Sequence, residues 1–532
     1  SRQFSSCAGL DAVCKMAPVE CAAVSWADDF IRPLLEGRRP RSKHTEFFAP
    51  KLEVKDSPGS GRGIFVTCSA TCGELLLFEA ACCEHDAAED GLDSATLAAW
   101  RGSNEHVRHR WSKLTTLDEA PSEVKKPQPI REWAMTQDTG GTSALSTPSV
   151  TWFSKVFQIN GMASLAVVDN DSGLRHIGHP ELSSKSRVSV YPVGGIVNHS
   201  CYPSLEKLAF PGWLVMRSVR PLGPGAELAH AYIDVRCPLH IRRKQLQQGW
   251  GFACQCDRCI LEEEAWADKK LHVESVKLWS SFTAMMDQKR SGLQAMYALV
   301  QAAERLTNKA LEQYLAREVS GKRGQDVSGF WFQFQPAFEL TAKQAQKIMN
   351  RQDPGKGADP TATAAFRRLR HLLLASYWLA PAMQYAHGLI YTRRFDQSLD
   401  LVSQIVDVLQ EVQPCSSLHV ATQAQMAMCA ADAARPQREV FELLAKAVEV
   451  TDAAYGDGCA TLEILMEQRL ARGDPSAQTL GRILKTLSST SSLRKSVGIP
   501  GCKGDALDEH EMLVVNGAPS GEPAVADLNC MD

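Results

Sequence analysis

The hydrophobic pattern of this chain changes at Cys259, and this change limits the possible folds more than any other feature. Before it, from Trp152 through Tyr232, short apolar runs alternate with glycine and proline turns, a pattern typical of strands. After it, from Leu261 to about Leu487, apolar residues recur at intervals of three and four, which predicts amphipathic helices in series. We therefore expect an α+β protein, with a β-rich domain followed by an all-α domain that is either an array of helical hairpins or a generic helical bundle.

Shifts in composition divide the chain further. An earlier strand, turn and strand are predicted within Gly59–Val66 and Cys72–Glu79, and the basic run at 38–43 has the character of a solvated linker. Small residues fall where a closely packed helix pair needs them, at Ala382, Ala386, Gly388 and Ser398. The predicted segments are an N-terminal extension at 1–58, a β-rich domain at 59–249 with an insertion at 84–150, a cysteine-rich segment at 250–260, a helical domain at 261–487 and a mobile tail at 488–532.

Composition excludes some classes of function. The 532 residues carry a formal net charge of -3, without the strongly basic field that general nucleic-acid binding needs, so we expect no direct nucleic-acid partner. No apolar run approaches the roughly 20 residues of a membrane span, so we expect a soluble protein of the nucleus or the cytoplasm. The 17 cysteines are scattered through a long chain, which favours a reducing compartment with some thiols on metal.

Three of these cysteines lie at C-x-C-x-x-C spacing, which lets them reach one tetrahedral Zn²⁺ and leaves one position for another ligand. Three reduced core cysteines are the alternative, but the polar neighbours Asp257 and Arg258 suit a loop better than a core. Arg258, Arg243 and Lys244 are candidates to offset the thiolate charge. The three cysteines are Cys254, Cys256 and Cys259, and the candidates for the fourth ligand are Cys201, Cys237, His230, His240, Cys68 and Cys72.

The stretch NHSCYPS, from Asn198 to Ser204, places an amide, an imidazole and a thiol in one short segment. It allows a cysteine nucleophile, a metal site or a rigid polar loop. The nucleophile is disfavoured because neighbours in an extended segment point to opposite sides, so His199 is not positioned as a base for Cys201. No glycine-framed nucleophile turn accompanies the stretch either.

Taken in order, the motifs of this chain resemble those of SET-domain protein lysine methyltransferases. The closer resemblance is to the SMYD-type and SET-TPR branch, in which a post-SET zinc segment and a tetratricopeptide-like (TPR-like) helical domain follow the SET domain. It covers roughly residues 59–260 by motif and the helical part by general character. The motifs are Gly61-Arg62-Gly63, Asn160-Gly161, Asn198-His199-Ser200-Cys201, Gly225-Ala226-Glu227-Leu228, Ala231-Tyr232-Ile233-Asp234 and the cysteine cluster.

This resemblance implies S-adenosyl-L-methionine as methyl donor and a protein lysine, on a histone or another protein, as acceptor. By motif, Tyr232 is the catalytic tyrosine, and Cys201 completes a zinc site with Cys254, Cys256 and Cys259. The residues implied in donor binding are Gly61, Arg62, Gly63, Asn160, Asn198, His199 and Phe252. We expect a monomer that acts on protein substrates and has no membrane partner.

The chain departs from the family pattern at three places. Ser204 stands where the family usually has a second asparagine, so we expect one lost hydrogen bond in this loop, and Ala231 replaces a commoner hydroxyl residue. Between Glu79 and Val150 there is no paired series of C-x-x-C motifs, so we expect no MYND zinc finger. Ser204 also leaves room for an alternative function, a SET-derived protein-interaction scaffold with little or no turnover.

Overall fold

The fold described here is that of a computed structural model. The described residues are 33–34, 46–86, 101, 111, 114, 126–135, 150–163, 187–210, 212–287, 292–319, 360–456, 458–471 and 481. They belong to one compact unit, Ser1–Lys485, and among them no helix is long and apolar enough to cross a membrane. The basic run at 38–43, most of the predicted insertion at 84–150 and the predicted tail at 488–532 lie outside the described residues.

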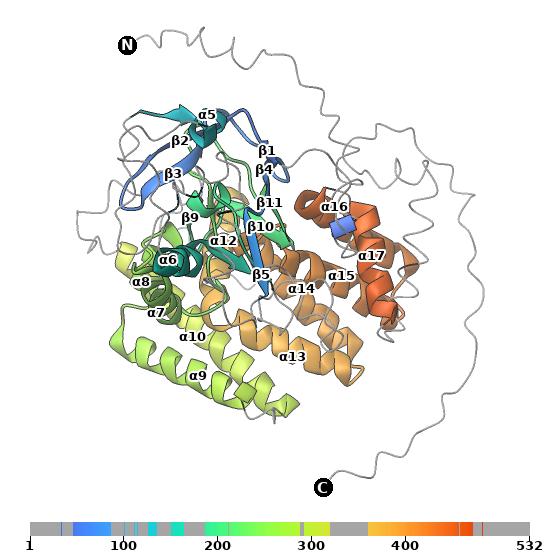
Figure 1. The fold of residues 1–532 in the computed structure, drawn as a ribbon. Coiled ribbons are helices and arrows are strands. Elements are labelled where there is room, and N and C mark those ends of the chain that lie inside the picture. The colour runs from blue at the N-terminus through green and yellow to red at the C-terminus, as the bar shows by residue number, and fades with distance from the viewer. Residues whose placement is uncertain are drawn as a thin grey trace, which may run out of the picture. The chain divides into compact units, whose positions relative to one another are not determined.

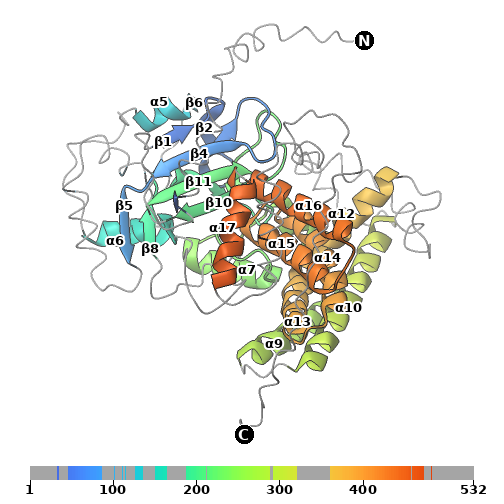
Figure 2. The ribbon, with the colours of Figure 1, turned by 90° about the vertical axis from the view of Figure 1, so that its right-hand side faces the viewer.

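Four antiparallel strands form the largest sheet of the β-rich part, and Figure 2 shows β4, β11 and β10 side by side. Its central strands carry apolar side chains such as Leu77 and Met216, which are fully buried in the same core. On β4, Phe78 stacks on Trp213 with ring centroids 5.0 Å apart. The strand order is β1 (Glu46–Phe48), β4 (Leu75–Ala80), β11 (Trp213–Ser218) and β10 (Leu205–Phe210).

Among the described residues of the β-rich part, two three-stranded sheets and one parallel strand pair accompany this sheet. Strands β3 and β4 confirm the strand, turn and strand predicted around residues 59–79. Strands β1 and β2 precede residue 59, and β2 pairs with β3, so the sheets begin within the segment predicted as an extension. The strands are β2 (Leu52–Ser57) between β3 (Gly61–Val66) and β6 (Gln128–Pro129), β8 (Arg187–Val190) between β5 (Cys83–Asp86) and β7 (Gly161–Ala163), and β9 (Asn198–His199) beside β12 (Ala229–His230).

The predicted change to an all-helical region is confirmed (Figure 1), but the helices begin with α7 at Leu239 and not after Cys259. Short helical elements described within the β-rich part include α5 (Ile130–Met135), α6 (Val150–Asn160) and the 3-10 helix η1 (Gly194–Ile196). The later helices are α7 (Leu239–Trp250), α8 (Asp257–Ala265), α9 (Lys269–Asp287), α10 (Leu293–Val319), α12 (Pro360–Tyr377), α13 (Leu379–Tyr391), α14 (Phe395–Val412), α15 (Ser417–Asp432), α16 (Gln437–Tyr455) and α17 (Gly458–Ala471). Consecutive helices from α13 to α17 contact one another, as in an array of hairpins.

The small residues predicted at a helix pair lie where α13 and α14 meet. Ala382, Ala386 and Ser398 are buried, and the Ser398 hydroxyl donates to the carbonyl oxygen of Ala386 at 3.5 Å. A Cβ atom at Gly388 would lie 2.8 Å from Leu293 Cδ1 on α10, so only glycine permits this approach without a shift. Small side chains therefore bring α10, α13 and α14 into close contact.

The β-rich part contacts the helical part directly. In the turn before β4, Gly73 has a φ of +80°, and a Cβ atom there would lie 2.9 Å from the Cα atom of Ala453 on α16. On β10, the Glu206 carboxylate accepts from the backbone N–H (3.0 Å) and the hydroxyl (3.2 Å) of Ser417 in the first turn of α15. Burial raises the pKa of Glu206 to about 7, as expected of a carboxyl group held between two packed elements.

The contact at Gly73 can be tested with two glycines of nearly equal backbone geometry. We expect Gly73→Ala to lower the unfolding free energy by about 2 to 4 kcal/mol, because left-handed strain adds to a clash with α16. Gly225 has a φ of +81° with nothing within 4 Å of its Cβ position, so Gly225→Ala incurs only the strain, about 1 to 2 kcal/mol. Urea unfolding of both variants gives the comparison, and equal losses would contradict the close contact.

Candidate functional site

Four cysteines from two distant stretches of the chain converge on one point. Cys201 follows β9, Cys254 and Cys256 lie between α7 and α8, and Cys259 lies in the first turn of α8. Their Sγ atoms all lie within 4.8 Å of one another, and this is the one potential metal-binding cluster found in the described part of the chain. Of the six candidates for the fourth position, the structure therefore brings Cys201 to the other three.

The chemistry of this donor set fits a zinc ion. Four sulfurs bound at about 2.3 Å in a tetrahedron would be about 3.8 Å apart, which falls within the spread of the cluster. A hydrogen bond with Cys201 lowers the pKa of Cys256 well below its ordinary value, whereas one with Cys254 raises the pKa of Cys201 well above it. Four adjacent thiols cannot all ionise without a cation, so the cluster suits a dication that balances their charge.

A buried guanidinium that the sequence did not single out contacts this cluster. Arg242 is fully buried on α7, and its Nε donates to Cys201 Sγ at 3.3 Å while Nη2 donates to Cys259 Sγ at 3.7 Å. The same Nη2 pairs with Glu262 at 2.8 Å, and Nη1 donates to the Cys237 carbonyl oxygen at 2.6 Å. Arg242 thus holds the two stretches together and offsets thiolate charge.

Of the basic residues that the sequence proposed for this role, Arg258 and Arg243 lie beside the cluster. Arg258 is fully buried, donates to the Cys201 carbonyl oxygen at 3.1 Å and pairs with Glu262 at 2.7 Å. Arg243 pairs with Glu263 at 2.7 Å and donates to the Cys254 carbonyl oxygen at 3.4 Å, while Lys244 is exposed. Glu262 therefore bridges two buried arginines. Its pairing with Arg258 follows from their i, i+4 spacing on one helix, whereas its pairing with Arg242 does not follow from spacing.

The residues just before Cys201 lie beside the strand that leads to Tyr232. Strand β9 pairs in parallel with β12, with Asn198 opposite Ala229 and His199 opposite His230. The Asn198 amide donates to the Arg62 carbonyl oxygen at 3.0 Å and to the Glu227 carboxylate at 2.6 Å. Asn198 thus joins three of the predicted motifs. Glu227 belongs to one of these motifs, but the sequence analysis gave it no role.

A glycine is required where these motifs meet. A Cβ atom at Gly63 would lie 2.3 Å from Glu227 Oε1 and 3.0 Å from Asn198 Nδ2, so any side chain there would displace both groups. Gly61 begins the same strand with a φ of +80°, a conformation that glycine adopts at little cost. Arg62, between them, is buried with its guanidinium 5.5 Å from the ring centroid of Trp133.

His199 links this strand pair to the cysteine cluster. Its Nδ1 accepts the backbone N–H of Tyr232 at 3.0 Å, so the proton lies on Nε2, which donates to Cys201 Sγ at 3.2 Å. Burial lowers the pKa of His199 to about 4, so the ring is neutral at physiological pH. Both ring nitrogens are therefore engaged within the protein.

Tyr232 lies in an aromatic setting. Its hydroxyl donates to the Val197 carbonyl oxygen at 2.7 Å, and its ring lies 5.2 Å from those of His199 and Trp250 and 4.8 Å from that of His230. Burial raises the pKa of Tyr232 well above its ordinary value, so the phenol stays protonated. Phe252 lies at the edge of this group, with its ring 6.0 Å from that of His199.

Asn160 ends α6 next to the same group. The indole N–H of Trp250 donates to the carbonyl oxygen of Ile159, the residue before Asn160, at 3.0 Å. Asn160 is buried, its amide donates to the Val156 carbonyl oxygen at 3.0 Å, and its Oδ1 lies 3.3 Å from the Cβ position of Gly195. The structure thus brings Asn160 to the neighbourhood of Tyr232 through Trp250, whose part the sequence did not predict.

Ser204 is more firmly held than the sequence suggested. Its Oγ accepts the Ala229 N–H at 2.8 Å and lies 3.3 Å from the carbonyl oxygens of both Glu227 and Ala229. Its own N–H donates to the Ala229 carbonyl oxygen at 2.9 Å. The shorter side chain therefore keeps the loop joined to the strand before Tyr232.

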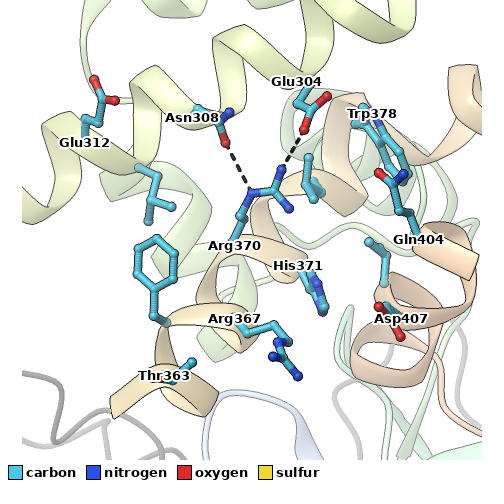
Figure 3. A pocket seen from close by; sticks show the side chains of 14 residues that line it. Glu304, Asn308, Glu312, Thr363, Arg367, Arg370, His371, Trp378, Gln404 and Asp407 are labelled. Atoms are coloured by element: carbon cyan, nitrogen blue, oxygen red, sulfur yellow. Dashed lines mark hydrogen bonds and ion pairs between the residues drawn. The ribbon is translucent and has the colours of Figure 1, made fainter. Parts of the chain in front are cut away.

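A separate pocket lies among the helices. It has a volume of about 640 Å³ and is lined mainly from α10, α12 and α14. Figure 3 shows Arg370 paired with Glu304 at 2.7 Å and bonded to Asn308 at 3.3 Å, with His371, Arg367 and Asp407 nearby. None of the site residues predicted from the sequence lines this pocket.

Comparison with known proteins supports the SMYD-type SET family over part of the chain, although no protein-family model matches it. The chain is 27% identical over 162 residues to a SET and MYND domain-containing protein of Dictyostelium discoideum, which covers 28% of this chain and 44% of that protein. It is 35% identical over 77 residues to the histone-lysine N-methyltransferase SMYD3 of Mus musculus, covering 14% of this chain and 18% of the relative.

It is also 30% identical over 95 residues to the N-lysine methyltransferase SMYD2 of Gallus gallus, covering 18% of this chain and 20% of that protein. The matched stretches thus span less than half the length of these curated relatives. Lysine methyltransferases recur among the names of these relatives, which supports a methyltransferase family.

Metal content tests the cysteine cluster. We expect one zinc per chain and a loss of zinc affinity of about tenfold or more in Cys201→Ser, because one thiolate ligand is removed. Cys237→Ser is the matched control, since Cys237 is a half-buried thiol near Arg242 that lies outside the cluster. Elemental analysis and chelator competition provide the measurement. Equal zinc loss in both variants would contradict the assignment of Cys201.

Proposed function

We propose that this protein is an S-adenosyl-L-methionine-dependent protein-lysine N-methyltransferase. Its SET domain would extend the predicted span of 59–249 back to β1 at Glu46, because β1 and β2 pair into its sheets. Its post-SET segment would be 250–260 and its TPR-like domain 261–487. A structural zinc would be held by Cys201, Cys254, Cys256 and Cys259. The observation that carries the proposal is the single strand pair that places Asn198, Glu227 and Tyr232 together while joining them through His199 to the cysteine cluster.

We assign donor binding to the groups around Asn198. Gly61, Arg62 and Gly63 would present backbone to the donor, while the missing side chain of Gly63 leaves room for Glu227 and Asn198 beside it. Asn160 and Asn198 would offer amide contacts, and Phe252 an aromatic face for the adenine. Since both ring nitrogens of His199 are engaged within the protein, its contribution would come from the ring edge and the backbone. Asn198, His199 and Phe252 are half-buried, so they border solvent on one side.

S-adenosyl-L-methionine supplies a methyl group already activated on a sulfonium sulfur. The task left to the protein is to align a neutral lysine amine with this methyl and to keep water out. Tyr232 suits the task because its protonated hydroxyl is fixed by donation to Val197 and keeps oxygen lone pairs for a polarised methyl or an ammonium proton. An apolar channel would lower the pKa of the acceptor lysine from about 10.4 by desolvation.

The acceptor side of the proposal is a protein carrying a lysine, on a histone or another protein. The names of the relatives include both histone-lysine and N-lysine methyltransferases. We propose that the protein acts as a monomer in the nucleus, the cytoplasm or both.

The alternative of a scaffold without turnover rested on Ser204. The hydrogen bonds of Ser204 to Ala229 remove the expected weakness in this loop, so no specific observation favours the scaffold. The enzyme is therefore the function that the site supports best.

Methyl transfer to protein tests the proposal. We expect Tyr232→Phe to reduce labelled methyl transfer onto a lysine peptide array by about tenfold or more, because the hydroxyl that orients the amine is lost. Donor binding, measured by calorimetry, should stay within about threefold of the wild type. The free energy of unfolding should fall by about 1 kcal/mol, since one hydrogen bond is removed.

The control is Tyr391→Phe, which removes a hydroxyl from a tyrosine that is 88% exposed on α13. It should transfer methyl groups at the wild-type rate. Equal transfer by Tyr232→Phe would refute the role of the tyrosine, and absence of donor binding to the wild type at millimolar donor would refute the enzyme itself.

A further inference from the structure

A second thiol arrangement joins the β-rich part to the helical part. Cys72 lies in the turn before β4, and Cys415 lies in the turn between α14 and α15. Their Sγ atoms are 3.6 Å apart although the residues are 343 positions apart in sequence. Cys72 is exposed and Cys415 is buried, so Cys72 is the cysteine of the pair that a dissolved oxidant can reach first.

The two turns are held against each other by contacts on both sides of the thiols. Next to Cys72, Gly73 packs on α16, and its carbonyl oxygen accepts from Arg217 Nη1 at 2.8 Å. Next to Cys415, Ser416 caps α15 by accepting the His419 N–H at 3.1 Å. A disulfide needs an S–S distance of about 2.05 Å, so the sulfurs must approach by about 1.5 Å.

The balance of groups around Cys72 favours its thiolate, although the Val219 carbonyl oxygen lies 3.3 Å from Sγ and can accept only from the protonated thiol. The hydrogen bond from the Cys415 thiol is the main cause that lowers the pKa of Cys72 to about 7, and the positive charge of Arg220 adds to it. Partial burial and the Glu449 carboxylate act in the opposite direction. Hydrogen bonding to Cys72 raises the pKa of Cys415, and burial and Glu206 add to this, so Cys415 keeps its proton. An accessible thiolate beside a protonated thiol is the arrangement of redox-sensitive cysteine pairs.

We propose that Cys72 and Cys415 are a reversible redox pair that peroxide converts into a disulfide joining the β-rich and helical parts. The Cys72 thiolate attacks hydrogen peroxide, whose O–O bond breaks, and with one proton gives a sulfenic acid and water. The Cys415 sulfur then attacks the sulfenic sulfur and loses its proton, the S–O bond breaks, and a second water leaves. Two electrons pass from the thiol pair to one peroxide, and a dithiol reverses the change.

The disulfide would act on a contact that also reaches the candidate site. Four residues before Cys415, Glu411 on α14 accepts the Tyr202 hydroxyl at 2.6 Å, and Tyr202 directly follows Cys201. Arg368 pairs with Glu411 at 2.5 Å, and Arg220 lies over the Tyr202 ring at 3.5 Å from its centroid. A covalent bond between Cys415 and Cys72 would therefore restrict the end of α14, which already contacts the residue after Cys201 through Glu411. The pair itself does not depend on the proposed methyl transfer.

Peptide mapping of the full chain tests the proposal. Purified protein is titrated with hydrogen peroxide, alkylated and digested without reduction, and zinc release is followed in the same samples. We expect the Cys72–Cys415 peptide to form before zinc is released and to disappear with dithiothreitol. Cys415→Ser should give no such peptide and should leave a dimedone-reactive sulfenic acid on Cys72. Cys68→Ser, in the same connection between β3 and β4, should behave like the wild type.

Alkylation rates test the hydrogen bond separately. With a pKa of about 7, about half of Cys72 is thiolate at pH 7, against about 1% at the ordinary value of 9.0. The lower nucleophilicity of a more acidic thiol offsets about tenfold of this gain, which leaves a net gain of about fivefold. We expect Cys415→Ala to slow iodoacetamide labelling of Cys72 by at most about fivefold, because Arg220 and the Gly73 backbone still favour the thiolate. Cys415→Ser, which keeps a donor, should retain most of the rate.

Three results would overturn the proposal. The first is the absence of the Cys72–Cys415 peptide at peroxide levels that already release zinc. The second is its formation only after zinc loss or under denaturing conditions, which would make it a product of unfolding. The third is equal labelling of Cys72 in the wild type and Cys415→Ala. The first two are read on the wild-type protein, so they do not depend on whether a variant folds.

Discussion

The buried charge balance around the four cysteines is the constraint on which the site depends. Arg242, Arg258 and Glu262 are each fully buried, and isolated charges at such depth would each cost several kcal/mol. Glu262 pairs with both arginines, while Arg242 also donates to two of the sulfurs. Four thiolates on a dication would carry two negative charges, which the two guanidiniums and one carboxylate reduce to one. Removing Glu262 would leave two buried guanidiniums without their carboxylate, and removing Arg242 would take a donor from two of the sulfurs.

This arrangement positions the strand pair as well as the metal ligands. Arg258 holds the Cys201 carbonyl oxygen, and His199 donates to the Cys201 sulfur, so the end of β9 is anchored from two sides. The other nitrogen of His199 accepts the N–H of Tyr232, which fixes the backbone of the proposed catalytic residue. The buried charges hold the cysteine cluster, the cluster holds His199 through Cys201, and His199 in turn positions the backbone of Tyr232. A structural metal can thereby influence a reaction in which it takes no chemical part.

The sequence predicted local features of this arrangement better than distant ones. The C-x-C-x-x-C spacing indicated three ligands, whereas six residues competed for the fourth position until a resemblance singled out Cys201. Periodicity predicted the helices, and Ala386 and Ser398 meet as expected, because helical spacing and small residues are local signals.

Pairing between distant segments carries no such signal. The sequence assigned no role to three residues of the site, because the fold alone brings them to their hydrogen-bond partners. These residues are Arg242, Trp250 and Glu227. Strand β2 was assigned to an extension for the same reason, since its six residues become a strand by pairing with β3 and β6. The contact between Cys72 and Cys415 is the extreme case, because no spacing rule relates two residues so far apart.

Ser204 shows how a departure from a family pattern can be absorbed. An asparagine amide brings two donors and one acceptor, whereas a serine hydroxyl brings one donor and accepts at the same atom. In this chain that oxygen accepts the Ala229 N–H, and its proton can reach either the Glu227 or the Ala229 carbonyl oxygen. The backbone N–H of Ser204 adds a third link to the same strand. The exit of the loop is thus fastened to the segment that leads into Tyr232, and a shorter side chain suffices because the backbone lies close enough to be reached.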